Sequence, residues 1–111
     1  MLEDTLKKIN VDLDILAEML KEKENVLEKS EYKKCVEWII EHKNTLISTK
    51  KDESIDNVLS GVLAMHIEKL IKLLEDNRDK CLQQIDVCKN DVNYFLSTIK
   101  SREENEKSNK L

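Results

Sequence analysis

The near absence of helix-breaking residues constrains this chain more than any other feature. Its 111 residues contain no proline and a single glycine, Gly61. Strands are enriched in β-branched and aromatic side chains and are bounded by turns rich in glycine and proline. Leucine, lysine, glutamate, isoleucine and aspartate dominate here instead. The sequence therefore predicts an all-α fold, an antiparallel helical bundle of three or four helices with one long C-terminal helix or helix pair.

A heptad seam predicts a first helix over residues 2–28. Its apolar side chains recur at alternating spacings of four and three residues, with Lys23 as the one polar interruption: Leu2, Leu6, Ile9, Leu13, Leu16, Leu20 and Leu27. This spacing is typical of helices that cross at about 20° in a bundle. We expect Ser30 to cap a second helix over residues 31–48, followed by a polar loop over residues 48–53.

The stretch 58–74 is the most apolar part of the chain, and its first half has no obvious polar face. A helix that is apolar on more than one side has to be covered on more than one side. We therefore expect the other helices to wrap around it. Gly61 lies within this stretch, where a glycine would permit close approach of a neighbouring helix.

Two architectures fit the chain beyond the polar loop. The apolar pattern continues almost unbroken over residues 54–100, which favours a single long helix. The alternative is a turn near residues 76–79 and a compact four-helix bundle, since Asn and Asp tolerate turns, although no glycine or proline marks one there. Residues 101–111 carry no apolar stripe and are predicted to form a frayed or disordered polar tail. The single bundle domain is thus expected to span residues 1–100.

Composition and charge argue against several classes of function. The net charge is −4, and acidic and basic side chains are interleaved, so the basic stripe of a nucleic-acid-binding protein is missing. No apolar run approaches the roughly 20 residues that span a membrane. The cysteine count is odd, and Cys81 and Cys88 are too far apart along one helix for a disulfide. We expect reduced thiols in a cytoplasmic protein without a signal peptide.

No constellation of residues predicts catalysis, a cofactor or a metal site. The residue three places before each histidine, His42 and His66, is apolar, so the Glu-x-x-His pairs of helical di-iron sites are absent. Cys35, beside Lys33 and Lys34, comes closest to the electropositive setting of a reactive thiol, but is expected to be unreactive. The sequence therefore predicts a protein that is not an enzyme.

Recognition of another protein through an apolar helical face is the chemistry that remains. Tryptophan is enriched at binding hot spots, and the stretch 85–99 holds two of the four aromatic residues, which suits a face for a partner's amphipathic helix. Two alternatives stay open: the tryptophan fills the edge of the core, and the stretch 85–99 closes the bundle. The candidate partner-binding residues are Trp38, Ile85, Val92, Tyr94, Phe95, Leu96 and Ile99.

The layout of the helices also resembles a known family. The run Leu16–Tyr32 ends a long first helix in a short acidic turn with tyrosine, and leads into the second helix at Cys35–Ile47. Later, Leu73–Lys80 is followed by Tyr94-Phe95-Leu96. This is similar to the flagellar type III export chaperones of the FlgN and FliT kind, over most of residues 2–100. The resemblance implies a small cytoplasmic helical chaperone that holds the helical terminus of an export substrate, with its C-terminal half as the binding face.

The favoured interpretation is thus a non-enzymatic, protein-binding helical protein, an export-type chaperone or adaptor. Two alternatives belong to other classes. A small inhibitor or immunity protein of bacteriocin or phage origin would carry a concentrated charged patch and bind its target very tightly. A structural coiled-coil oligomerisation module would form a stable homodimer, whose mass does not change when candidate partners are added.

Overall fold

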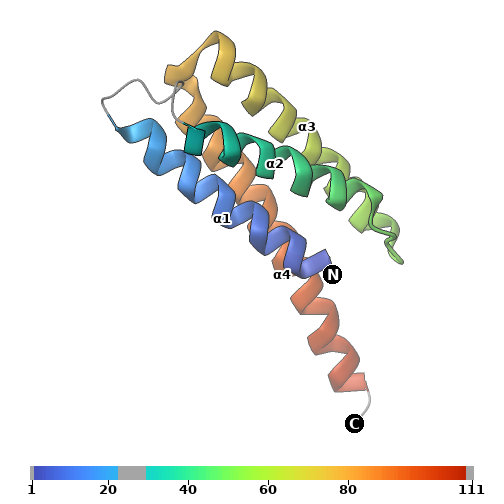
Figure 1. Cartoon of the computed structure of the whole chain (residues 1–111). Coiled ribbons are helices and arrows are strands. Elements are labelled where there is room, and N and C mark those ends of the chain that lie inside the picture. Colours follow the sequence, from blue (N-terminus) through green and yellow to red (C-terminus); the bar gives the residue numbers. More distant parts are fainter. Residues whose placement is uncertain (1, 23–29, 110–111) are drawn as a thin grey trace.

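The computed structural model describes residues 2–22 and 30–109, with side chains to residue 106. Four α-helices follow one another along the chain (Figure 1): α1 (Leu2–Lys21), α2 (Ser30–Ser48), α3 (Ser54–Asp76) and α4 (Cys81–Asn109), with the short 3₁₀ helix η2 (Arg78–Lys80) before α4. No strand occurs within the described ranges. The prediction of an all-α bundle is therefore confirmed.

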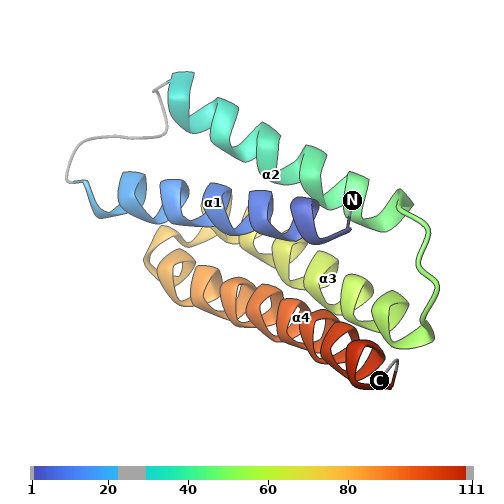
Figure 2. The ribbon, with the colours of Figure 1, turned by 90° about the horizontal axis from the view of Figure 1, so that it is seen from below.

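The four helices form a square in which each helix is antiparallel to the next. α1 and α3 each pack against both α2 and α4, so α1 and α3 lie diagonally opposite (Figures 1 and 2). The molecule is elongated, 56 × 22 × 21 Å, because the 29-residue α4 runs beyond the end of the other helices (Figure 1). None of the described helices is both long and apolar enough to cross a bilayer.

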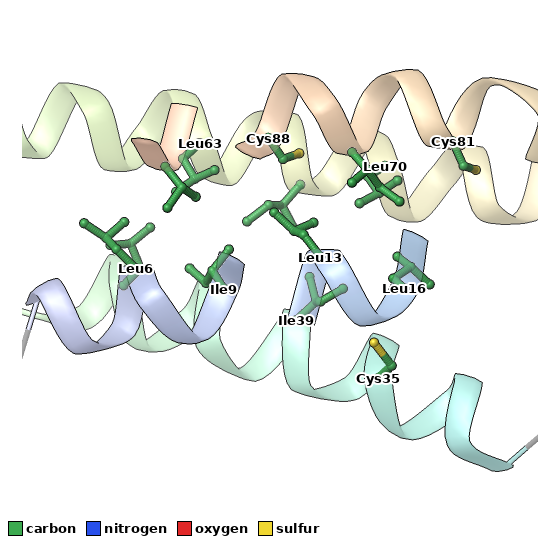
Figure 3. Close-up of a cluster of buried hydrophobic side chains, with 14 of the residues drawn as sticks. Leu6, Ile9, Leu13, Leu16, Cys35, Ile39, Leu63, Leu70, Cys81 and Cys88 are labelled. Atoms are coloured by element: carbon green, nitrogen blue, oxygen red, sulfur yellow. The ribbon is translucent and has the colours of Figure 1, made fainter. Parts of the chain in front are cut away.

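All four helices contribute to one hydrophobic core (Figure 3). Four side chains of the heptad seam predicted for the first helix are fully buried, Leu6, Ile9, Leu13 and Leu16, whereas Leu2 and Leu20 near the ends of α1 are partly buried. Each fully buried leucine contributes about 1.5–3 kcal/mol through the apolar surface removed from water. The part of that predicted helix over residues 23–28, with Leu27, lies outside the described residues. The side chains at the centre of the core include Leu6, Ile9, Leu13, Leu16, Ile39, Leu63, Ile67, Leu70, Ile85 and Phe95.

The favoured prediction of one continuous helix over residues 54–100 is wrong. α3 ends at Asp76, and the chain reverses through Asn77 and η2 before α4 begins. Asn77 leaves the helical region at φ −152° and ψ 84°, and its N–H donates to the carbonyl of Leu73. No described residue takes a positive φ, so this turn needs neither glycine nor proline. The reversal lets the apolar stripes of α3 and α4 cover each other, which a single long helix could not do.

Residues 101–109 of the predicted frayed or disordered tail are helical, because α4 continues to Asn109; residues 110–111 lie outside the described residues. Arg102 Nη2 donates to Asp56 Oδ2 at 2.8 Å, and the Asp56 side chain is only 6% exposed. Residues 101–109 of α4 have no apolar stripe, and the ion pair of Arg102 with Asp56 holds this end of α4 against α3. α4 thus continues past residue 100, where the predicted bundle domain ends.

The polar loop between α2 and α3 lies where the sequence predicts it. Lys51 Nζ folds back and donates to the backbone carbonyl oxygens of Leu46 at 2.5 Å and Thr49 at 2.7 Å. These oxygens lie at and just beyond the C-terminal end of α2, where carbonyl groups lack helical partners. Burial lowers the pKa of the Lys51 ammonium. Its hydrogen bonds satisfy carbonyl groups at the C-terminal end of α2.

The stretch 58–74 is covered on two sides, by α2 and α4, but its outermost face is not covered. Val58 and Met65, on α3, are 60% and 58% exposed, and Ile55 is 44% exposed. In a four-helix square each helix has two neighbours, so its outermost face stays open to water. A Cβ added at Gly61 would meet nothing within 4 Å, so the close neighbour expected there is not part of the described chain.

Candidate partner-binding groove

A groove of about 520 Å³ lies between the N-terminal half of α2 and the C-terminal end of α3. The two helices converge at the loop that joins them and separate toward the other end, where the groove lies (Figures 1 and 2). Its floor is apolar and its rim charged: the floor consists of Tyr32, Val36, Ile71 and Leu74, the rim of Lys33, Glu37 and Glu75.

Two of the floor residues are buried in the core, and the other two expose part of their apolar surface to the groove. Tyr32 and Leu74 are each 6% exposed and belong to the core, while Val36 and Ile71 are half-buried and pack against it. Burial is the main cause that raises the pKa of the Tyr32 phenol, with a further contribution from Cys81. The hydroxyl therefore stays neutral, and the floor carries no charge that an apolar ligand would have to desolvate.

Polar contacts link α1 and α2 along the interface between them, which we call the α1–α2 seam. His42 Nδ1 lies 2.5 Å from Asp12 Oδ2, and Cys35 Sγ donates to the Asp12 carbonyl at 3.4 Å. The pKa of Asp12 is raised, because burial outweighs the hydrogen bond and the charge of His42, which act to lower it. This seam therefore holds a mostly buried polar pair.

The two seams that involve α4 are tied in a similar way. Between α3 and α4, His66 pairs with Asp91, and Gln84 Nε2 donates to the His66 carbonyl at 2.9 Å. Between α1 and α4, the side-chain amides of Asn10 and Asn93 are joined at 3.0 Å, and Lys89 pairs with Asp14. Each of these seams thus has two polar contacts or more.

The α2–α3 seam, the interface between α2 and α3, has fewer polar side-chain contacts among the described residues than the other three. Between the described parts of these helices the only polar side-chain contact is Lys43 Nζ to Glu68 Oε1, at 3.4 Å, and the Glu68 side chain is 63% exposed. An exposed ion pair of this kind contributes about 0–1 kcal/mol. The groove therefore opens in the seam whose helices lose the fewest polar side-chain contacts when they separate.

The groove residues can bind an apolar side chain but are poorly equipped for chemistry. All three cysteines are buried as free thiols, and burial is the largest cause that raises the pKa of Cys35 to about 11 and of Cys88 to about 12. Thiols with such pKa values are hardly nucleophilic near neutral pH. Within the part of the chain that the structure describes, no group of three His, Cys, Asp or Glu residues could hold a metal ion.

The candidate residues predicted from the sequence do not come together on one surface. Ile85, Val92, Phe95 and Ile99 are core residues, at most 8% exposed, and a partner could reach them only if the bundle opened. For these four residues the structure agrees with the alternative interpretation, that the stretch 85–99 closes the bundle. The remaining three are more accessible: Leu96 packs partly buried against the core, while Trp38 and Tyr94 are 45% and 63% exposed.

Sequence reasoning missed the groove. Tyr32 and Val36 are four residues apart on α2, and Ile71 and Leu74 three apart on α3, a spacing that marks a helix face but not its neighbour. Trp38, the aromatic residue that the sequence singles out on α2, does not line it. No local signal distinguishes an open seam from a closed one.

Comparisons of the chain with protein-family models, with curated proteins and with solved structures found no match. The resemblance to the flagellar export chaperones therefore stays a prediction.

Proposed function

We propose that this protein is a non-enzymatic binding protein that holds an amphipathic helix of a partner protein in the groove between α2 and α3. The observation that carries the proposal is the apolar floor of that groove, open to solvent in the most weakly tied seam of the bundle. A partner helix with apolar side chains at spacings of three and four residues would insert one or two of them.

The rim gives the proposed partner a charge pattern. Lys33 on α2 faces a groove whose other rim charges are Glu37 and Glu75. Rim charges add little affinity, but they select register and disfavour partners of the wrong charge. A helix with basic residues beside its apolar anchors, and one acidic residue to meet Lys33, fits this pattern.

The resemblance to export chaperones supports one kind of partner, the helical terminus of an export substrate. It places the binding face in the C-terminal half of the chain, whereas our proposal uses one wall from α2 and one from α3. A cytoplasmic location belongs to the same proposal, and three buried free thiols suit a reducing compartment.

The test is direct binding of labelled peptides. Fluorescein-labelled copies of the terminal amphipathic helices of export substrates encoded in the same genome are titrated with the protein, and binding is followed by anisotropy. Val36→Glu places a carboxylate on the groove floor beside Glu37 and Glu75, and should raise the dissociation constant by at least about tenfold, or 1.4 kcal/mol.

Val11→Glu is the matched control, because Val11 is an exposed valine on α1, outside the groove. It should bind the peptides like the unmodified protein, and circular dichroism should show both variants equally helical. Equal affinity of Val36→Glu and Val11→Glu would place binding elsewhere and refute the groove. Failure of all these peptides to bind would refute the proposed class of partner.

A further inference from the structure

The outward face of α3 carries an apolar stripe on a different side of the helix from the groove. Ile55, Val58 and Met65 are 44%, 60% and 58% exposed, and Val62 between them is half-buried. Their spacings of three, four and three residues put them on one face. Within the part of the chain that the structure describes, no helix covers this face.

Gly61 lies beside this stripe and is exposed. A glycine in an exposed helix interior is destabilising by roughly 0.5–1 kcal/mol relative to alanine. Nothing in the described chain accounts for it, because a Cβ there would meet no atom within 4 Å and the backbone φ is not positive. A helix from outside the molecule that approaches α3 closely at this point would account for it.

Acidic side chains adjoin one end of the stripe and lysines the other, with exposed Lys50 also at the first end and exposed Asp76 at the second. Asp52 and Glu53 precede the first turn of α3, while Lys69 and Lys72 continue the stripe at its C-terminal end. All four are exposed, and none forms an ion pair with another described residue. A second copy laid antiparallel would bring acids against lysines at both ends, whereas a parallel copy would bring like charges together.

We propose that α3 is the contact through which two copies of this chain form an antiparallel dimer. A two-fold axis near Gly61 and Val62 places Val58 of one copy opposite Met65 of the other, and Asp52 opposite Lys72. The contact is isologous, so every pairing occurs twice. A face of about three helical turns buries less than the roughly 1,200 Å² of stable interfaces, so the dimer is weak, with a dissociation constant of micromolar or above.

Disulfide trapping in the full-length protein tests the register, because the native thiols are buried. Val62→Cys lies near the axis and should cross-link with its own copy under mild oxidation. Val58→Cys and Met65→Cys, each oxidised alone, should form no cross-linked dimer, because each cysteine is about 10 Å from its equivalent, too far for a disulfide. A mixture of the two should cross-link. Cross-linking of each with itself would show a parallel pair and overturn the proposal.

Sedimentation over a concentration series tests the dimer itself. Met65→Lys and Gly61→Ala should each raise the dissociation constant at least tenfold, whereas Val11→Lys on α1 should leave it unchanged. Gly61→Ala is the sharper variant, because it stabilises the isolated helix and cannot act by unfolding. An unchanged dissociation constant in Gly61→Ala would overturn the close approach at this residue. A protein that stays monomeric up to about 1 mM would overturn the dimer.

Discussion

At the scale of single residues, neighbours in sequence have opposite environments. Tyr94 is 63% exposed and Phe95 is fully buried, although both are aromatic and both lie in the stretch that the sequence singles out for partner binding. Their helical positions differ by about 100°, enough to turn one ring to water and the other to the core. Composition therefore identifies the aromatic segment, but only the orientation of α4 in the bundle decides which ring is buried and which is exposed.

This pair yields a prediction for stability. Phe95→Ala removes a core ring and should lower the free energy of unfolding by about 3–5 kcal/mol. Tyr94→Ala removes an exposed ring and should change it by no more than about 0.5 kcal/mol. Urea denaturation followed by circular dichroism measures both. Equal losses would show that Tyr94 is packed, contrary to the structure.

The buried thiols predict a loss of stability in alkali. Burial raises the pKa of Cys88 to about 12 and of Cys35 to about 11, above the value near 8.5 of an exposed thiol. Between these values the unfolded chain releases protons that the folded chain keeps, so the free energy of unfolding falls as pH rises from about 9 to 11. Melting temperatures across this range measure the fall, and Cys88→Ala should make it less steep.

At the scale of helices, the ends of α3 and α4 show how little local signal a boundary can have. α3 stops at Asn77 without glycine or proline, and α4 continues past residue 100 without an apolar stripe. In both places a long-range contact decides the outcome: the mutual cover of the two stripes at the turn, and the pairing of Arg102 with Asp56 at the far end.

Truncation tests the far end of α4. Removing residues after Lys100 deletes Arg102 and leaves the Asp56 carboxylate, 6% exposed, without its partner. An unsatisfied buried charge of this kind should lower the free energy of unfolding by about 1–3 kcal/mol. Truncation after Glu103 keeps the pair and should have a much smaller effect. Chemical denaturation of the two proteins gives the comparison, and equal stabilities would contradict the proposed anchor.

At the scale of the whole molecule, four seams close one core and only one is weakly tied. The α2–α3 seam has a single exposed ion pair, Lys43 with Glu68, and it is there that the groove opens. The outward face of α3 is left bare for a different reason, since a square of four helices gives each only two neighbours. Two surfaces on opposite flanks of α3 thus remain available for contacts with other chains.

Small-angle scattering tests the compact arrangement. At concentrations below those of self-association, the radius of gyration should lie near the 15.5 Å of the backbone, enlarged slightly by side chains and hydration. A continuous helix over residues 54–100 would be about 69 Å long by its rise per residue. That length exceeds the 56 Å long axis of the bundle. A maximum dimension that requires the longer helix would contradict the turn at Asn77.

The sequence by itself determined that the bundle is all-α, because a chain without proline and with one glycine has few ways to be anything but helical. It also identified the core face of α1, since heptad spacing marks which side chains share a face. The turn at Asn77, the burial of Phe95 and Ile99, the groove beside Val36 and the open stripe at Val58 and Met65 were decided only by the tertiary structure. Periodicity shows that a face is apolar, but which neighbour covers it, or whether any does, depends on how the helices pack.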